Sequence, residues 1–216
     1  MDTLYNSLRM ACYVAIFGTI LIFTGAYMVE KGRGFRKGRA AFQFLAMMPM
    51  AVPGLVLGLA YICFFNAPDN PLNVIYNTMP ILVICTITHF YTVAHLTAIT
   101  ALKQMDAEFE AISASLKQPF YITFWRVTLP ICLPAVLDIA LYLFVNAMTT
   151  VSAVVFLWGP DTNLAAVSVL QLEDFGHIEG AAGLSTLILY VNVAVRTAHH
   201  FATRAMERHT QLWRTR

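Results

Sequence analysis

Long runs of apolar residues, separated by short polar stretches, dominate the pattern along the chain. Uncharged runs cover residues 10–29, 40–68 and 70–102, and a fourth run, 127–159, contains Asp138 as its one charged residue. An α-helix needs about 20 apolar residues to cross the hydrocarbon core of a bilayer. Each run reaches that length, so the pattern predicts a polytopic membrane protein.

The runs predict an all-α bundle of about five transmembrane helices, with the whole chain, residues 1–216, as one membrane domain. The expected spans are residues 8–29, 42–66, 74–101, 130–157 and 182–202. The last span contains Arg196, which can reach the membrane surface from near a helix end.

Composition agrees with this class and excludes several functions. The chain is 58% hydrophobic and 12% charged, whereas soluble domains have about 25% charged residues. It contains no GxxxxGK[ST] phosphate loop, so any ATP would be hydrolysed by another subunit. The cysteines and histidines have no metal-ligand spacing. We therefore expect no catalytic residues, no metal site, no cofactor and no enzymatic activity.

Basic residues predict how the spans are oriented. Residues 30–40 contain five Lys or Arg, 102–129 contain three, and the tail after residue 202 contains four. Residues 66–77 and 159–180 contain none. The positive-inside rule then places the basic connections and the C-terminus in the cytoplasm and the N-terminus outside, with only Arg9 opposing.

The polar loop at about 102–129 interrupts the apolar pattern and predicts two short amphipathic helices. Apolar residues recur at helical spacing in each half: Phe109, Ile112 and Leu116, then Phe120, Phe124 and Val127. Gln118-Pro119 separates the halves. The apolar faces need a cover. This is either the lipid headgroup layer or a soluble partner.

The stretch EAISASLKQPFYITFWRVTLP, residues 110–130, resembles the EAA loop of permease subunits of binding-protein-dependent ABC importers, of the MetI-like type I class. The matching positions are Glu110, Ala111, Leu116, Phe124, Arg126, Val127, Leu129 and Pro130. Lys117 occupies the usual glycine position, and the acid lies one residue further from Leu116 than usual. We therefore expect Pro119, and not a left-handed residue, to shape the break. Residues 6–23 and 48–62 extend the resemblance across the chain.

The resemblance implies a multi-pass permease of the bacterial inner membrane that forms a translocation path for a small solute. Its partners would be cytoplasmic ABC ATPase subunits, a second identical or different permease half, a periplasmic binding protein and the lipid bilayer, without nucleic acid. The ATPase-coupling residues would be Glu110, Ala111, Leu116, Lys117, Phe120, Phe124, Trp125, Arg126 and Pro130. The aromatic residues would be anchors, and Glu110 and Arg126 would set the register by charge.

The substrate is suggested only by a narrower resemblance. Residues 89–121 and 141–165 resemble permeases for 2-aminoethylphosphonate, in a branch that includes permeases for iron(III) and polyamines. Iron(III) or a polyamine is therefore the alternative substrate. A membrane enzyme or an inactive half-permease fragment are the alternative functions.

Polar residues in the fourth span are candidates for the translocation path: Asp138, Asn146, Thr149 and Thr150. A carboxylate within a membrane helix is costly and often functional. Asp138 either lines the path or pairs between subunits, or it reaches the interface or pairs with a neighbouring helix. Ordinary hydrogen bonding between helices explains the other three equally well. The acidic connection 159–180 contacts a binding protein or is simply solvated.

Overall fold

The computed structural model describes residues 2–32, 34, 36–106 and 108–210, without the side chains of Glu110 and of residues 206–210. In this part of the chain every regular element is a helix. Three helices are long and apolar enough to cross a membrane: α1 (Asp2–Lys31), α4 (Met79–Lys103), and Ile178–Ala205 within α10 (Ile178–Thr210).

Two further spans are broken helices. In the first, α2 (Arg36–Met47) and a 3₁₀ turn (Met48–Ala51) meet α3 (Gly54–Phe65) at a bend of 110°. In the second, α6 (Phe120–Thr123), a π-helical turn (Phe124–Thr128) and α7 (Leu129–Ile131) meet α8 (Leu133–Thr149) at 76°. The predicted helical bundle is thus confirmed, with three unbroken candidate spans and up to five if each bent pair counts as one span, but the prediction of continuous helices over 42–66 and 130–157 was wrong.

Proline explains where these spans break. Pro53 cannot donate a backbone hydrogen bond, and it pushes the preceding Val52 out of the helical region, to φ −104° and ψ 120°. In the second span, Cys132 lies between Pro130 and Pro134 and leaves helical geometry at φ −86° and ψ 5°. That span also ends early, because Thr150 is extended and residues 152–157 form turns.

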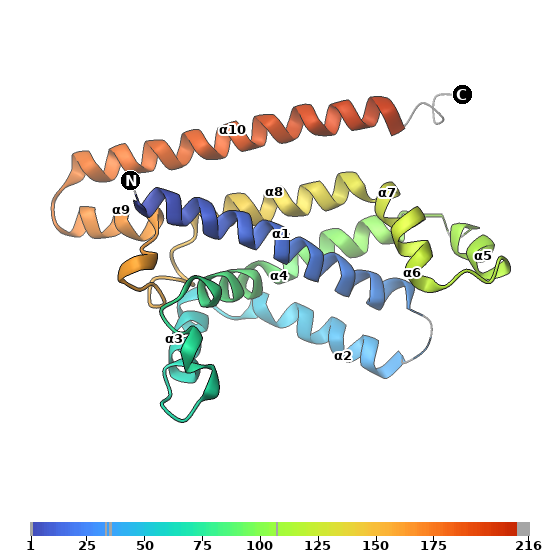
Figure 1. Ribbon diagram of the computed structural model, residues 1–216, viewed down its shortest axis with the longest axis horizontal. Helices are drawn as coiled ribbons and strands as arrows, with labels where there is room; N and C mark the ends of the chain where they lie inside the picture. The colour runs from blue at the N-terminus through green and yellow to red at the C-terminus, as the bar shows by residue number, and fades with distance from the viewer. Residues whose placement is uncertain (1, 33, 35, 107, 211–216) are drawn as a thin grey trace.

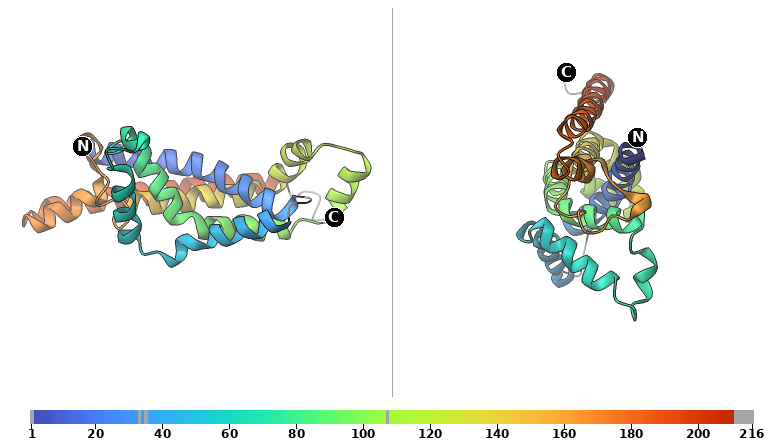
Figure 2. Two further views of the ribbon diagram at one scale, coloured as in Figure 1. Left: turned by 90° about the horizontal axis from the view of Figure 1, so that it is seen from below. Right: turned by 90° about the vertical axis from the view of Figure 1, so that its left-hand side faces the viewer.

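Helix α1 lies at the centre of the bundle, between α4 and α8 (Figure 1). Figure 2 shows α10 on one side of the bundle and α2 and α3 on the opposite side. The three central helices meet at Gly18, where an added Cβ would lie 2.8 Å from Leu143 Cδ1 and 3.3 Å from Ile87 Cγ1. Small residues permit such close approach of membrane helices, which associate largely by van der Waals packing.

The connections gather at two opposite ends of the bundle. The end of α1, the start of α2, the helices of the 108–129 segment and the end of α10 lie at one end, which we call the basic end (Figure 1, right). The N-terminus and α9 (Ala165–Asp174) lie at the other end, where Asn6 Nδ2 donates to the Asp161 carbonyl (3.0 Å) and Ser7 Oγ accepts from the Ala165 amide (2.8 Å). This is the grouping that the basic residues predicted.

Replacing Gly18 with leucine should destabilise the bundle. The added side chain would collide with Leu143 and Ile87, and overpacking of this kind costs about 1–3 kcal/mol. Thermal unfolding of the detergent-solubilised protein, followed by size-exclusion fluorescence, should show a lower midpoint. Gly183→Leu on α10 is the matched control, because no atom lies within 4 Å of its added Cβ. Equal midpoints for the two variants would contradict the proposed packing role.

Candidate functional site

The loop between α4 and α8 folds into a helical elbow at the basic end (Figure 1). Its first helix, α5 (Glu108–Ser115), begins after Asp106, whose Oδ1 accepts from the Glu108 amide at 3.0 Å. Its second part consists of α6 and the π-helical turn that follows it. Both predicted short helices are therefore confirmed. The Ser113 and Thr123 hydroxyls form a hydrogen bond that ties the two parts together.

The turn between the two parts is formed by Lys117 in a left-handed conformation, with φ +51°. The Gln118 amide donates to the Ser113 carbonyl (3.0 Å), and the Lys117 amide donates to the Ala114 carbonyl (3.1 Å). This pair of bonds is the Schellman arrangement that ends many helices. The prediction that Pro119 would shape the break was therefore wrong. The hydrogen bonds to the last carbonyl groups of α5 stabilise the turn by more than the steric free-energy cost of a lysine in the left-handed conformation.

The inner face of the elbow packs on the end of α1. The ring of Tyr27 lies 4.5 Å from that of Phe120 and 4.7 Å from that of Phe124, measured between centroids. Phe23 contacts Phe124 at 6.0 Å, and the Tyr27 hydroxyl donates to the Phe120 carbonyl at 3.4 Å. Phe120 and Phe124, expected to be anchors for a partner, thus contact α1 within the same chain.

Four apolar residues of the elbow, which together we call its outer face, are left exposed by the part of the chain that the structure describes. The exposed fractions are 56% for Ile112, 65% for Leu116, 65% for Tyr121 and 64% for Trp125. Tyr121 and Ile112 were not among the expected coupling residues. The i, i+4 spacing of Tyr121 and Trp125 was the available signal.

The remaining expected coupling residues also lie on the elbow. Ala111, Arg126 and Pro130 are exposed. Glu110 belongs to α5, but its side chain lies outside the described residues. Beside this contact, a cleft of about 410 Å³ lies between part of the elbow and the end of α1 and is lined in part by Tyr27, Ser113 and Gln118. The structure therefore brings the expected residues into one unit, attached to the bundle through α1 and through the start of α8.

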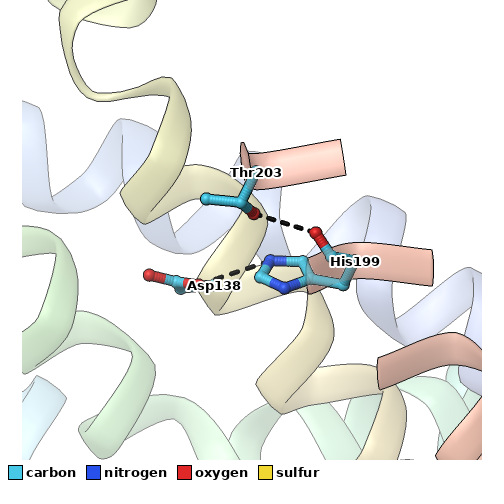
Figure 3. A network of polar contacts seen from close by, with 3 residues as sticks. All are labelled: Asp138, His199 and Thr203. Atoms are coloured by element: carbon cyan, nitrogen blue, oxygen red, sulfur yellow. Dashed lines mark hydrogen bonds and ion pairs between the residues drawn. The ribbon is translucent and has the colours of Figure 1, made fainter. Parts of the chain in front are cut away.

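Asp138 lies on α8 and faces α10. Its Oδ1 is 3.3 Å from Nε2 of His199, as Figure 3 shows, and an ion pair forms when the histidine is protonated. The side chain of Asp138 is 59% exposed and that of His199 is 17% exposed. Of the alternatives given in the sequence analysis, Asp138 in this single chain therefore pairs with a neighbouring helix.

The other path candidates make local hydrogen bonds. Asn146 Nδ2 donates to the Tyr142 carbonyl (2.7 Å), and Thr149 Oγ1 donates to the Val145 carbonyl (3.1 Å). Thr150 is buried at the end of the helix. These contacts remain within α8, so they do not assemble a shared polar site. Among the described residues, no three His, Cys, Asp or Glu side chains lie close enough together to hold a metal ion.

Replacing Lys117 with glycine should stabilise the elbow. Glycine adopts a positive φ without the steric cost of a side chain, which is about 1–2 kcal/mol, although its more flexible unfolded state removes part of the gain. We expect amide exchange at Gln118 to slow by roughly two- to fivefold on that basis, measured by hydrogen–deuterium exchange. Lys117→Ala is the control, since it removes the same side chain but keeps the strain. Equal exchange in both variants would contradict this interpretation.

Curated relatives of the chain are ferric transport proteins. The chain is 34% identical over 181 residues to the ferric transport system permease protein FbpB of Actinobacillus pleuropneumoniae, an alignment that covers 84% of this chain and 25% of that protein. It is 35% identical over 92 residues to the putative ferric transport system permease-like protein AfuB of Escherichia coli (strain K12), with 43% of this chain and 77% of that protein covered. The chain spans about a quarter of the length of FbpB.

Solved structures share the fold at low sequence identity. A bacterial ABC transporter that imports the acidic polysaccharide alginate matches with a TM-score of 0.80 at 13% identity, over 94% of this chain and 78% of that chain. An inward-facing form of the MetNI methionine ABC transporter matches with a TM-score of 0.76 at 13% identity, over 94% of both chains. The family model of the binding-protein-dependent transport system inner membrane component matches residues 10–208, so the chain belongs to that family.

Proposed function

We propose that the chain is a permease subunit, or one half of a longer permease, in an ABC importer, and that its elbow docks a cytoplasmic ATPase subunit. Family membership supports the general assignment. The observation that carries the docking role is the uncovered apolar outer face, placed on a helical projection at the basic end. The positive-inside rule makes the basic end the cytoplasmic one. A periplasmic binding protein and a second permease subunit complete the proposed assembly.

The elbow has two faces with different proposed roles. Ile112, Leu116, Tyr121 and Trp125 offer apolar groups of the kind that dominate binding at interfaces, and Arg126 adds a charge beside them. The inner aromatic residues connect the elbow to Tyr27 of α1. A displacement of the docked elbow would therefore reach α1, which packs against α4 and α8. An ATPase that binds two positions of the elbow with different affinity would shift the bundle between two states.

Removing the outer aromatic residues should break this docking. We expect Tyr121→Ala combined with Trp125→Ala to weaken ATPase-subunit binding by at least about 30-fold, since the loss of even one anchor residue often costs about 2 kcal/mol or more. The measurement is co-purification, followed by titration with the purified ATPase subunit.

The matched control is Tyr190→Ala combined with Phe201→Ala on α10, which removes equally exposed aromatic rings (66% and 65%) away from the elbow. Docking is disproved if the elbow variant keeps full ATPase affinity while its thermal unfolding matches that of the unaltered protein.

The substrate we propose is iron(III), delivered by the binding protein. The names of the relatives support it, and iron(III) was already the alternative to 2-aminoethylphosphonate in the sequence-based prediction. 2-Aminoethylphosphonate remains the second candidate, because residues 89–121 and 141–165 resemble permeases for that compound.

The two substrates can be separated in proteoliposomes that contain the permease, its ATPase and the binding protein encoded beside them. We expect iron(III)-loaded binding protein to stimulate ATP hydrolysis severalfold over the unloaded form, and 2-aminoethylphosphonate to have no effect. Stimulation by 2-aminoethylphosphonate alone would reverse the assignment. The elbow variant should abolish stimulation by either compound.

A further inference from the structure

A second cleft at the basic end lies where the end of α1, the start of α2 and the end of α4 meet. Its volume is about 420 Å³. Three of its lining residues are basic (Arg36, Arg39 and Lys103), and one, Glu30, is acidic. The other lining residues are Val29, Ala40, Gln43 and Ile99. The cleft does not include the elbow, so it belongs to neither face described above.

Arg39 gives this cleft a fixed wall. Its Nε donates to the Val29 carbonyl (2.5 Å), its Nη1 to the Gly32 carbonyl (2.6 Å) and its Nη2 to the Glu30 carbonyl (3.3 Å). The last carbonyls of a helix lack partners within the helix and carry partial negative charge. One guanidinium group therefore caps α1 and joins it to α2, which sets the shape of the cleft.

Arg36 and Lys103 remain available to a ligand. Both side chains are exposed, and neither forms a hydrogen bond or an ion pair in the part of the chain that the structure describes. Arg39 is occupied by its bonds to the end of α1, and Glu30 is the one acidic group among the described residues that line the cleft. The cleft thus has excess positive charge and two unused sets of donors, which suits a phosphate group.

The surface beside the cleft suits a ligand with an apolar tail. Helix α2 begins with Arg36 and Lys37 and then exposes Phe44 (66%) and Leu45 (64%), and the 3₁₀ turn that follows exposes Met48 (46%), so a basic start is followed by an apolar continuation. It runs from the basic end along the flank of the bundle (Figure 1). A helix of this pattern lies with its basic part at the headgroups and its apolar part against the acyl chains.

We propose that this cleft binds the headgroup of an anionic phospholipid, with the phosphate between Arg36 and Lys103 and the acyl chains along the exposed apolar side of α2. Basic pockets between transmembrane helices at the cytoplasmic side are well suited to such headgroups. Soluble phosphate would bind the same two cations, but it has no acyl chains that could contact the apolar side of α2. The lipid would hold α2 against α4 at the membrane surface.

The test is lipid titration of the purified, intact protein in detergent, with bound lipid counted by native mass spectrometry. Phosphatidylglycerol is the anionic probe and phosphatidylcholine the zwitterionic one. Arg36→Gln combined with Lys103→Gln should weaken phosphatidylglycerol binding by roughly 30-fold, because a basic residue near the membrane surface contributes about fivefold. Arg196→Gln combined with Arg204→Gln, both on α10, is the control. It removes the same charge from exposed positions that do not line the cleft.

The proposal stands if the unaltered protein and the control retain phosphatidylglycerol in preference to phosphatidylcholine and the cleft variant does not. Equal binding of the two lipids by the unaltered protein overturns it, as does unchanged phosphatidylglycerol binding in the cleft variant. A third arm adds inorganic phosphate to the lipid-loaded protein. Displacement of the lipid at phosphate concentrations similar to that of the lipid would assign the cleft to soluble phosphate and also overturn the proposal.

Discussion

The packing of α1 against α4 and α8 is the contact on which the rest of the structure depends. At the N-terminal end of α1, Asn6 and Ser7 bind the segment that starts α9. At its other end, Tyr27 holds the elbow and Arg39 caps the helix. One helix of 30 residues therefore connects the two ends of the bundle. Because its middle is fixed by close contact at Gly18, movement at one end is not easily absorbed within the helix.

The broken spans follow from a second constraint, which is that backbone polar groups inside a membrane need partners. At the breaks, side chains of α4 form hydrogen bonds with some of these backbone groups. Thr92 Oγ1 donates to the Ala46 carbonyl at 2.8 Å, and Cys85 Sγ donates to the Ala153 carbonyl at 3.4 Å. A side chain at Gly54 would collide with Ser152 Oγ, so the two irregular segments lie side by side. The irregular segments therefore lie next to α4, whose side chains donate hydrogen bonds to backbone carbonyl groups at the breaks.

The sequence predicts what depends on local pattern and misses what depends on distant partners. The predicted span 8–29 lies within α1, and most of 74–101 lies in α4, although α4 begins only at Met79, after a 3₁₀ turn and an irregular segment at 76–78. Pro53 was visible in the sequence, but a proline can kink a helix or end it, and the outcome depends on which groups accept the freed backbone. Lys117 was misjudged because local preference was given more weight than the two hydrogen bonds that close α5. The spacing of Phe120 and Phe124 predicted a shared apolar face, but Tyr27, roughly 93 residues earlier, decides what it contacts.

The two-faced elbow gives a physical reason for its unusual content of aromatic residues. The inner rings already fix the elbow to α1, so the outer ones are not needed to hold the chain's own fold. Exposing them to water has a free-energy cost of roughly 25 cal/mol for each Å² of apolar surface. The π-helical turn at Phe124–Thr128 adds a residue to the helical repeat at the point where both faces must be presented. A segment that only connected α4 to α8 would need neither feature, whereas both are expected of a segment that packs on α1 with one face and, as proposed above, binds a partner with the other.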